Sequence, residues 1–295
     1  MDSPASPVKN RYADAPKNAD YTIDQQWESY SPEEHDRWDR LFARQREILP
    51  GRACGAFLKA LDSLRLSGGG IPHMGRLSDR LEKLTGWRVV PVADLVPDEV
   101  FFDHLANRRF PAGAFIRPEA EFDYLQEPDV FHDIFGHVPM LADPVFAEFM
   151  EAYGKGGQRA MRRDQLHNLA RLYWYTVEFG LVDTPEGLRI FGAGIASSPN
   201  ESVFSLEDPS PNRIRLKLER VMRTRYIIDD FQRTYFVIDS FENLLERCYR
   251  DFAGLYDAVV GKEDIEPQQI VDGDAVLHRG TQAWFDTGRV SPENR

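Results

Sequence analysis

The spacing of apolar residues along the chain predicts a mainly helical protein. A helix is expected to begin at Ser31, where a capping residue is followed by a first-turn proline and two glutamates. Apolar residues then recur on one helical face as far as Ile48, and Pro50 and Gly51 end the pattern. A second helix is predicted over residues 53–66, closed by a run of three glycines.

The same signals recur further along the chain. Additional helix starts, each with an acidic residue next to a proline, are predicted at Asp98, Asp129 and Asp143. Residues 166–182 form the most apolar segment, and we expect one central helix there. Short strand-like runs lie at residues 188–191, 226–228 and 235–238. The pattern therefore predicts a mainly α fold, a single helical domain with a few short β-strands.

Composition sets the expected boundaries of that domain. Residues 1–25 are rich in Pro, Ala, Asp and Asn without apolar periodicity, which predicts a flexible N-terminal arm. Residues 26–260 are expected to form the domain itself. Residues 261–295 are interrupted by prolines and glycines, so we expect a C-terminal extension without a heptad-repeat tail.

Charge and cysteine usage exclude several classes of function. A formal net charge of -12 argues against a nucleic-acid partner, because phosphate contacts need clustered Lys and Arg. The sequence contains no run of about 18 apolar residues and no basic-then-apolar leader, so neither a membrane partner nor export is expected. Cys54 and Cys248 stand alone, which favours free thiols in a cytoplasmic protein.

Two histidines in the segment 127–139 are candidate metal ligands. His132 and His137 are five residues apart, and on an ideal α-helix they would be separated by about 140°. We therefore expect the helix to end between them, since Gly136 and Pro139 both disfavour helix and would let His137 turn back towards His132. Imidazoles suit iron, zinc and copper. The alternative is that both are core histidines bonded to backbone carbonyls.

Glu178 strengthens the metal hypothesis. Its neighbours one turn away include Trp174 and Val182, and an unpaired carboxylate is costly to bury among such residues. An ion pair with Arg171 is the alternative explanation. Two histidines and one carboxylate form the facial triad of non-haem ferrous enzymes, although zinc accepts the same three ligands.

A further polar pair and a small-residue segment complete the candidate chemistry. Arg117 could bind a substrate carboxylate through two parallel hydrogen bonds, or could lie at the surface. Asp129 could orient that arginine, or could cap a helix. The segment 192–198 is rich in Gly, Ala and Ser and would let backbone approach a ligand closely, but it could equally form a turn.

Taken together and in this order, these segments resemble the pterin-dependent aromatic amino acid hydroxylases. The segments 127–139, 173–180 and 192–198 carry the resemblance, which extends more weakly over residues 30–250. It is strongest to the short bacterial members that act on phenylalanine. Asp133 and Leu125 differ from the residues of the animal members at the pterin and substrate sides.

The resemblance implies a role for each candidate residue. The ligands of Fe²⁺ would be His132, His137 and Glu178, with Tyr173 beside the metal. The substrate-binding residues would be Arg117, Asp129, Pro128, Trp174, Phe179 and Ser197. Among these, Arg117 would bind the substrate carboxylate and be positioned by Asp129. The cofactor tetrahydrobiopterin would contact Phe101 and Asp133.

The implied activity is that of a phenylalanine 4-monooxygenase. It would convert L-phenylalanine to L-tyrosine with O2 and the reduced pterin, as a monomer in phenylalanine catabolism. Tryptophan or tyrosine hydroxylation by the same family is the nearest alternative. A zinc hydrolase with the same three ligands, or a ligand-binding protein with structural histidines, would be the unrelated readings.

Overall fold

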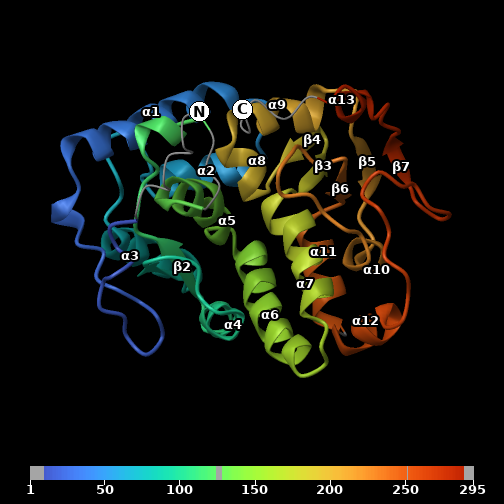
Figure 1. The fold of residues 1–295 in the computed structure, drawn as a ribbon, viewed down its shortest axis with the longest axis horizontal. Helices are drawn as coiled ribbons and strands as arrows, with labels where there is room; N and C mark the ends of the chain where they lie inside the picture. The colour runs from blue at the N-terminus through green and yellow to red at the C-terminus, as the bar shows by residue number, and fades with distance from the viewer. Residues whose placement is uncertain (1–9, 124–127, 251, 289–295) are drawn as a thin grey trace, which may run out of the picture.

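The computed structural model describes residues 10–123, 128–250 and 252–288. Helices form most of the framework, and two β-sheets lie within it (Figure 1). The α-helices are α1 (Pro32–Ile48), α2 (Gly55–Ser63), α3 (Met74–Thr85), α4 (Asp98–Ala106), α5 (Val138–Leu141), α6 (Pro144–Met161), α7 (Leu166–Tyr173), α8 (Ala193–Ser197), α9 (Pro199–Glu207), α10 (Leu218–Met222), α11 (Phe241–Arg250), α12 (Phe252–Val259) and α13 (Ala283–Asp286). The prediction of a mainly α fold is confirmed.

Four further helical segments are not α-helices. Two are short 3₁₀-helices, η1 (Trp27–Ser29) and η2 (Glu119–Glu121). The other two are π-helices, η3 (His132–His137) and η4 (Trp174–Glu178). Both π-helices continue directly into or out of an α-helix, since η3 is followed by α5 and η4 follows α7. π-Helical turns inside α-helices are frequent at functional sites.

The predicted helix starts agree with the capping chemistry. Ser31 caps α1 by accepting the backbone N–H of Glu34, while the Glu34 carboxylate accepts the N–H of Ser31 in a capping box. Asp143 caps α6 in the same way by accepting the N–H groups of Val145 and Phe146. These local bonds are why the sequence alone placed both starts correctly.

The strands form two separate sheets. The strands are β1 (Arg88–Val92), β2 (Arg109–Gly113), β3 (Leu181–Thr184), β4 (Gly187–Ile190), β5 (Asn212–Arg215), β6 (Thr234–Ile238) and β7 (Val276–His278). β1 and β2 pair in parallel, whereas the larger sheet has the order β4-β3-β6-β5-β7, with β3, β6 and β5 parallel. In Figure 1, helices α6 and α7 run side by side between the two sheets.

Two secondary-structure predictions are wrong. The apolar segment 166–182 is not one helix, because the helical backbone ends at Glu178 and β3 begins at Leu181. Residues 226–228 are not a strand. The carbonyl of Ile227 accepts a side-chain N–H of Gln232 rather than a neighbouring strand, so no ladder forms there.

Both regions outside the expected domain pack against it where the structure describes them. Tyr12 and Ile23 are buried, and the Tyr12 hydroxyl donates to the carbonyl of Gln25. In the extension, β7 pairs with β5, and a buried Arg220–Asp274 ion pair holds the segment before it. The boundaries at residues 25 and 260 stay predictions. Among the described residues, no helix is long and apolar enough to cross a membrane.

Candidate metal centre

The π-helix η3 explains how two histidines five residues apart meet. Its hydrogen bonds close at the fifth residue instead of the fourth, so residues at i and i+5 stand nearly above one another. His132 and His137 begin and end this segment, and their rings lie 4.9 Å apart between centroids. The expectation that the helix ends between them is therefore wrong. The backbone stays helical through Gly136 and Pro139 into α5.

Glu178 is the last residue of the second π-helix, η4. Its alternative partner, Arg171, is occupied elsewhere, because its guanidinium donates to both carboxylate oxygens of Asp264 at 2.7 and 2.8 Å. Gly192 lies against the backbone of Glu178, and a Cβ at Gly192 would fall 2.4 Å from the Glu178 carbonyl oxygen. The small-residue segment therefore packs against the backbone of a candidate ligand residue.

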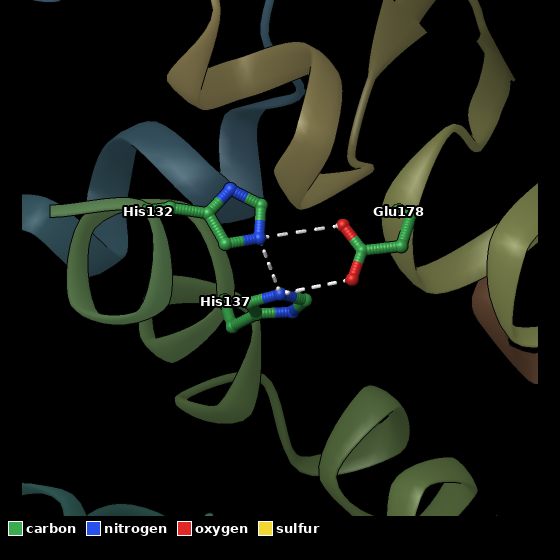
Figure 2. A group of neighbouring side chains, drawn as sticks. All are labelled: His132, His137 and Glu178. Carbon is green, nitrogen blue, oxygen red and sulfur yellow. Dashed lines mark hydrogen bonds and ion pairs between the residues drawn. The ribbon is translucent and has the colours of Figure 1, made fainter. Parts of the chain in front are cut away.

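Three candidate ligand atoms converge at one point (Figure 2). The Nε2 atoms of His132 and His137 are 3.2 Å apart, and Glu178 Oε1 lies 3.2 Å from His137 Nε2. Glu178 Oε2 lies 3.6 Å from His132 Nε2. All three side chains point inwards from two different π-helices and offer one ligand atom each.

The spacing of these atoms fits a metal ion. Metal–ligand bonds of about 2.1 Å at angles of roughly 90–110° place neighbouring donor atoms about 3.0–3.4 Å apart. Two of the observed separations, at 3.2 Å, lie within that range, and the third, at 3.6 Å, lies just above it. Two imidazoles and one carboxylate on one face are the donor set of non-haem ferrous oxygenases, with positions left open for other ligands.

A hydroxyl group fixes the tautomer of His132. Ser197 Oγ lies 2.9 Å from His132 Nδ1 and donates its own proton to the carbonyl of Ala193 at 2.8 Å. With that proton committed, Ser197 accepts from Nδ1–H, which leaves the Nε2 lone pair of His132 directed at the centre. Ser197, expected to line an amino-acid site, thus contacts a candidate ligand directly.

The electrostatics of the centre favour binding of a cation. Burial lowers the pKa of His132 to about 4, so that ring is neutral. Burial also acts to lower the pKa of His137, but the adjacent Glu178 carboxylate outweighs it and raises that pKa. Burial likewise opposes ionisation of Glu178, yet His137 and His132 lower its pKa overall. A carboxylate held ionised beside two imidazoles is suited to a divalent metal.

Arg117 and Asp129 form a buried, bidentate ion pair. The guanidinium donates from Nε and Nη2 to the two Asp129 oxygens, each at 2.9 Å, and Asp129 is fully buried. Asp129 Oδ1 also accepts the backbone N–H of His132 at 3.0 Å. Both sequence hypotheses for Asp129 therefore hold, since it orients Arg117 and caps the helix that carries the histidines.

An aromatic wall lies beside Glu178. The rings of Trp174 and Phe179 are 4.8 Å apart, and Tyr226 stacks on Trp174 at 4.4 Å with an 18° angle between the planes. The indole N–H of Trp174 donates to Gln232 Oε1 at 2.9 Å. Trp174 and Phe179 were predicted from the sequence motifs, whereas Tyr226 and Gln232, which lie in or beside an irregular loop outside those motifs, were missed.

A cavity of about 320 Å³ opens onto the three candidate ligands. Besides His132, His137 and Glu178, its lining includes Phe101, Pro128, Asp133 and Tyr173. Four residues assigned by resemblance are thus brought to one cavity with the ligands. Arg117, Asp129, Trp174, Phe179 and Ser197 are not among the lining residues of this cavity. Asp129 and Ser197 contact His132, and Arg117 contacts Asp129. Leu125 lies outside the described residues.

Burial raises the pKa of two polar groups in the cavity. Burial raises the pKa of Asp133 to about 7, and its Oδ2 accepts the N–H of Gly113 at 2.7 Å. Burial also raises the pKa of Tyr173 far above its ordinary value, so the phenol stays protonated. The rings of Phe101 and Tyr173 meet edge to face at 5.8 Å. The cavity therefore combines flat apolar surfaces with a few polar atoms, as ligand sites generally do.

Comparison with known proteins places these features in a family. Residues 9–258 match the model for biopterin-dependent aromatic amino acid hydroxylases. The phenylalanine-4-hydroxylase of Caulobacter vibrioides is 62% identical over 269 residues, covering 91% of this chain and 92% of the relative. That of Ralstonia nicotianae is 55% identical over 272 residues, covering 92% of this chain and 87% of the relative.

A solved structure shows the same fold. The iron- and phenylalanine-bound phenylalanine hydroxylase of Chromobacterium violaceum superposes with a TM-score of 0.85 at 50% identity, covering 88% of this chain and 96% of that one. A cobalt-bound structure of the same relative gives a TM-score of 0.87, also at 50% identity, and covers 89% of this chain and 95% of the other. The family match over residues 9–258 includes both π-helices that carry the candidate ligands.

Proposed function

This chain belongs to the biopterin-dependent aromatic amino acid hydroxylases, and on that premise we propose that it is a phenylalanine 4-monooxygenase. It would convert L-phenylalanine to L-tyrosine with O2 and a tetrahydropterin at a ferrous centre. One observation carries the proposal, which is the convergence of His132, His137 and Glu178 at the wall of a cavity large enough for organic ligands. High identity to phenylalanine-4-hydroxylases over most of the chain supports the choice of substrate.

In this proposal the metal is held by His132 Nε2, His137 Nε2 and one Glu178 oxygen. Ferrous iron and the tetrahydropterin, when bound, would supply the oxygen activation that no protein side chain performs on a benzene ring. The task of the protein is then orientation and exclusion of water. Ser197 contributes to orientation, because it holds His132 in the tautomer whose Nε2 lone pair would face the metal.

We propose that Arg117 binds the carboxylate of the substrate. Its guanidinium is already fixed in one plane by two hydrogen bonds to Asp129, which removes the rotational freedom that binding would otherwise have to freeze. Asp129 also accepts the N–H of His132, the first residue of η3, so the group that would bind the substrate and the helix that would bind the metal are tied to one carboxylate. This arrangement would set the distance between the bound amino acid and the metal.

The aromatic ring of the substrate would be held by Trp174, Phe179 and Pro128. Trp174 begins η4, four residues before Glu178, and Phe179 directly follows Glu178, so a ring against both would lie close to the metal. Apolar walls there would direct the ring and leave no partner for an added hydroxyl. On the other side, Phe101 would stack on the pterin and Asp133 would contact it, with Tyr173 beside the metal.

We also propose that the enzyme is a cytoplasmic monomer acting in phenylalanine catabolism, with a catalytic domain over residues 26–260. Two free, buried cysteines are compatible with a reducing compartment. The net charge of -12 disfavours nucleic-acid partners. Light scattering of the purified protein tests the monomer, because a particle mass near 33.9 kDa is expected.

The activity is tested with metal-free protein reloaded with Fe²⁺. L-Phenylalanine and a reduced tetrahydropterin are added in air, and L-tyrosine is measured by chromatography, with parallel reactions that contain Zn²⁺ or lack the pterin. We expect tyrosine only in the complete mixture. Folded, iron-loaded protein that forms no tyrosine would overturn the substrate assignment. L-Tryptophan and L-tyrosine, tested in the same reactions, decide between the family's other activities.

A further inference from the structure

Gln232 lies outside every motif identified in the sequence, yet its side chain is almost fully buried, with 1% exposure. Its Oε1 accepts the indole N–H of Trp174 at 2.9 Å, and its Nε2 donates to the carbonyl of Ile227 at 2.9 Å. An indole N–H can only donate and a carbonyl can only accept, so one orientation of the amide satisfies both. The amide therefore bridges the aromatic wall and a loop.

The backbone of Gln232 is also held in place. Its N–H donates to Glu201 Oε1 at 3.3 Å, and the Tyr235 hydroxyl donates to the same oxygen. Glu201 belongs to α9, and Tyr235 to the central strand β6, which begins two residues after Gln232. The amide thus projects from a rigid junction of sheet and helix, the kind of support that a precise site requires.

The amide and one stacked ring both connect the indole of Trp174 to this loop. Residues 226–230 form an irregular loop that exposes Ile228 to 73%. Its Tyr226 ring stacks on Trp174 at 4.4 Å, and Trp174 packs at 4.8 Å on Phe179, next to the metal ligand Glu178. Loss of the amide would release both the rotation of the indole and the attachment of the loop that backs it.

We propose that Gln232 is a positioning residue for the aromatic wall. It fixes the Trp174 indole and the 226–230 loop as one unit and so sets the space available to the ring of the substrate. The proposal rests on the proposed function, since it assumes that the Trp174 wall receives the ring of the substrate. The side chain of Gln232 bonds to Trp174 and Ile227, and Gln232 is not one of the lining residues of the cavity, so we expect its effect on substrate affinity and ring selection. Iron binding is independent of it.

The test compares Gln232→Met with Gln232→Glu in the full, Fe²⁺-loaded chain. Methionine keeps the length but removes both hydrogen bonds, whereas glutamate can still accept from the indole but cannot donate to Ile227. For Gln232→Met we expect a KM for L-phenylalanine raised by roughly tenfold, as for one lost buried hydrogen bond, with kcat changed by less than about threefold. Gln232→Glu is expected to lie between Gln232→Met and the parent.

Two further readouts separate positioning from a general loss of structure. The ratio of turnover with L-tryptophan to turnover with L-phenylalanine should rise in Gln232→Met, because a loosened wall admits the larger ring. Iron content should equal that of the parent and of Gln269→Met, a change at an exposed glutamine. An unchanged KM and an unchanged substrate ratio in folded, iron-loaded variants would overturn the proposal. If Gln232→Met does not fold, Gln232→Glu decides by the same criteria.

Failure of the proposed function is recognised separately. L-Phenylalanine binding to the iron-loaded parent and variants is measured by calorimetry, which requires no turnover. A parent that binds L-phenylalanine without forming tyrosine contradicts the activity, and the roughly tenfold affinity loss in Gln232→Met then still supports the positioning role. A parent that does not bind L-phenylalanine contradicts both.

Discussion

The metal-binding half of the site and its aromatic wall are built in different ways. The ligands come from two π-helices that are continuous with α-helices, and Asp129 and Ser197 hold His132 in the first of them. The wall relies on an irregular loop that is tied to Trp174 by one glutamine and one stacked tyrosine. The chemistry of a ferrous centre tolerates little displacement, whereas a wall supported by a loop can be adjusted, so we expect the two halves to respond differently to substitution.

The largest effect is expected in the metal half, from Glu178→Ala. Loss of an outer partner of a metal ligand already costs about 10–100-fold in affinity or activity, so removal of a ligand should lower iron affinity and tyrosine formation by more than about 100-fold. Iron titration and the tyrosine assay measure both quantities. Glu186→Ala, at an exposed glutamate between β3 and β4, is the control and should leave both unchanged. Retained iron binding in Glu178→Ala would remove this residue from the triad.

Asp129→Ala tests how firmly the metal half is fastened to Arg117. It leaves the buried Arg117 guanidinium without its carboxylate and the His132 N–H without its acceptor. We expect the free energy of unfolding to fall by about 3–5 kcal/mol, as when one partner of a buried ion pair is removed. Urea denaturation measures it. Asp123→Ala breaks the more exposed pair with Arg44 and should cost less than about 1 kcal/mol. Equal losses in the two variants would contradict the role of Asp129.

Ser197→Ala addresses the tautomer of His132 alone. Without the acceptor at Nδ1, the ring is free to place its proton on Nε2, and iron affinity should fall by about 10–100-fold. The matched change is Ser202→Ala, which removes another buried hydroxyl from the same region that bonds only backbone carbonyls. That variant should be less stable but bind iron as the parent does. If both variants bind iron equally, Ser197 does not set the tautomer.

The smallest effect is expected at the base of the loop and depends on pH. Hydrogen bonds from Arg171 and Arg225 lower the pKa of Asp264 to about 2, which ties α7 to the start of the loop. Because the folded-state pKa lies below the ordinary value of 3.8, this stabilisation is present above about pH 4 and is lost as the pH falls towards 2. With Asp264 a third exposed, it should amount to less than about 1 kcal/mol.

Asp264→Asn should therefore be slightly less stable than the parent at pH 7 and equally stable near pH 2. Denaturation followed by circular dichroism at a series of pH values measures the difference. A stability gap that persists unchanged down to pH 2 would show that the Asp264 charge does not fasten the loop.

The sequence predicted features that depend on local interactions and missed features that depend on distant contacts. The helix starts at Ser31 and Asp143 were predicted because capping is a local interaction. His132, His137 and Glu178 were candidates because of their residue types and the apolar setting of Glu178, and the resemblance to the family implied that they are the ligands. The π-helical backbone was not predicted, because over five or six residues the apolar patterns of π- and α-helices cannot be told apart.

The residues that support the aromatic wall were not predicted, because their contacts are distant in the sequence. Gln232 is a single polar residue beside an irregular loop. Its hydrogen bond to the indole of Trp174 joins two residues that are 58 positions apart in the sequence. Residues 226–228 resembled a strand because Tyr and Ile favour extended structure, but their backbone and rings are bound by side chains instead of a neighbouring strand. Tertiary contacts of this kind have no signature in a local pattern.

The central claim is that one metal ion is bound by ligands from both π-helices. Anomalous diffraction from crystals loaded with Fe²⁺ tests this claim most directly. Data collected on either side of the iron absorption edge locate the ion independently of any assay. We expect one strong anomalous difference peak within about 2.0–2.3 Å of His132 Nε2, His137 Nε2 and a Glu178 oxygen. A peak elsewhere, or one bonded to only one of the two helices, would contradict it.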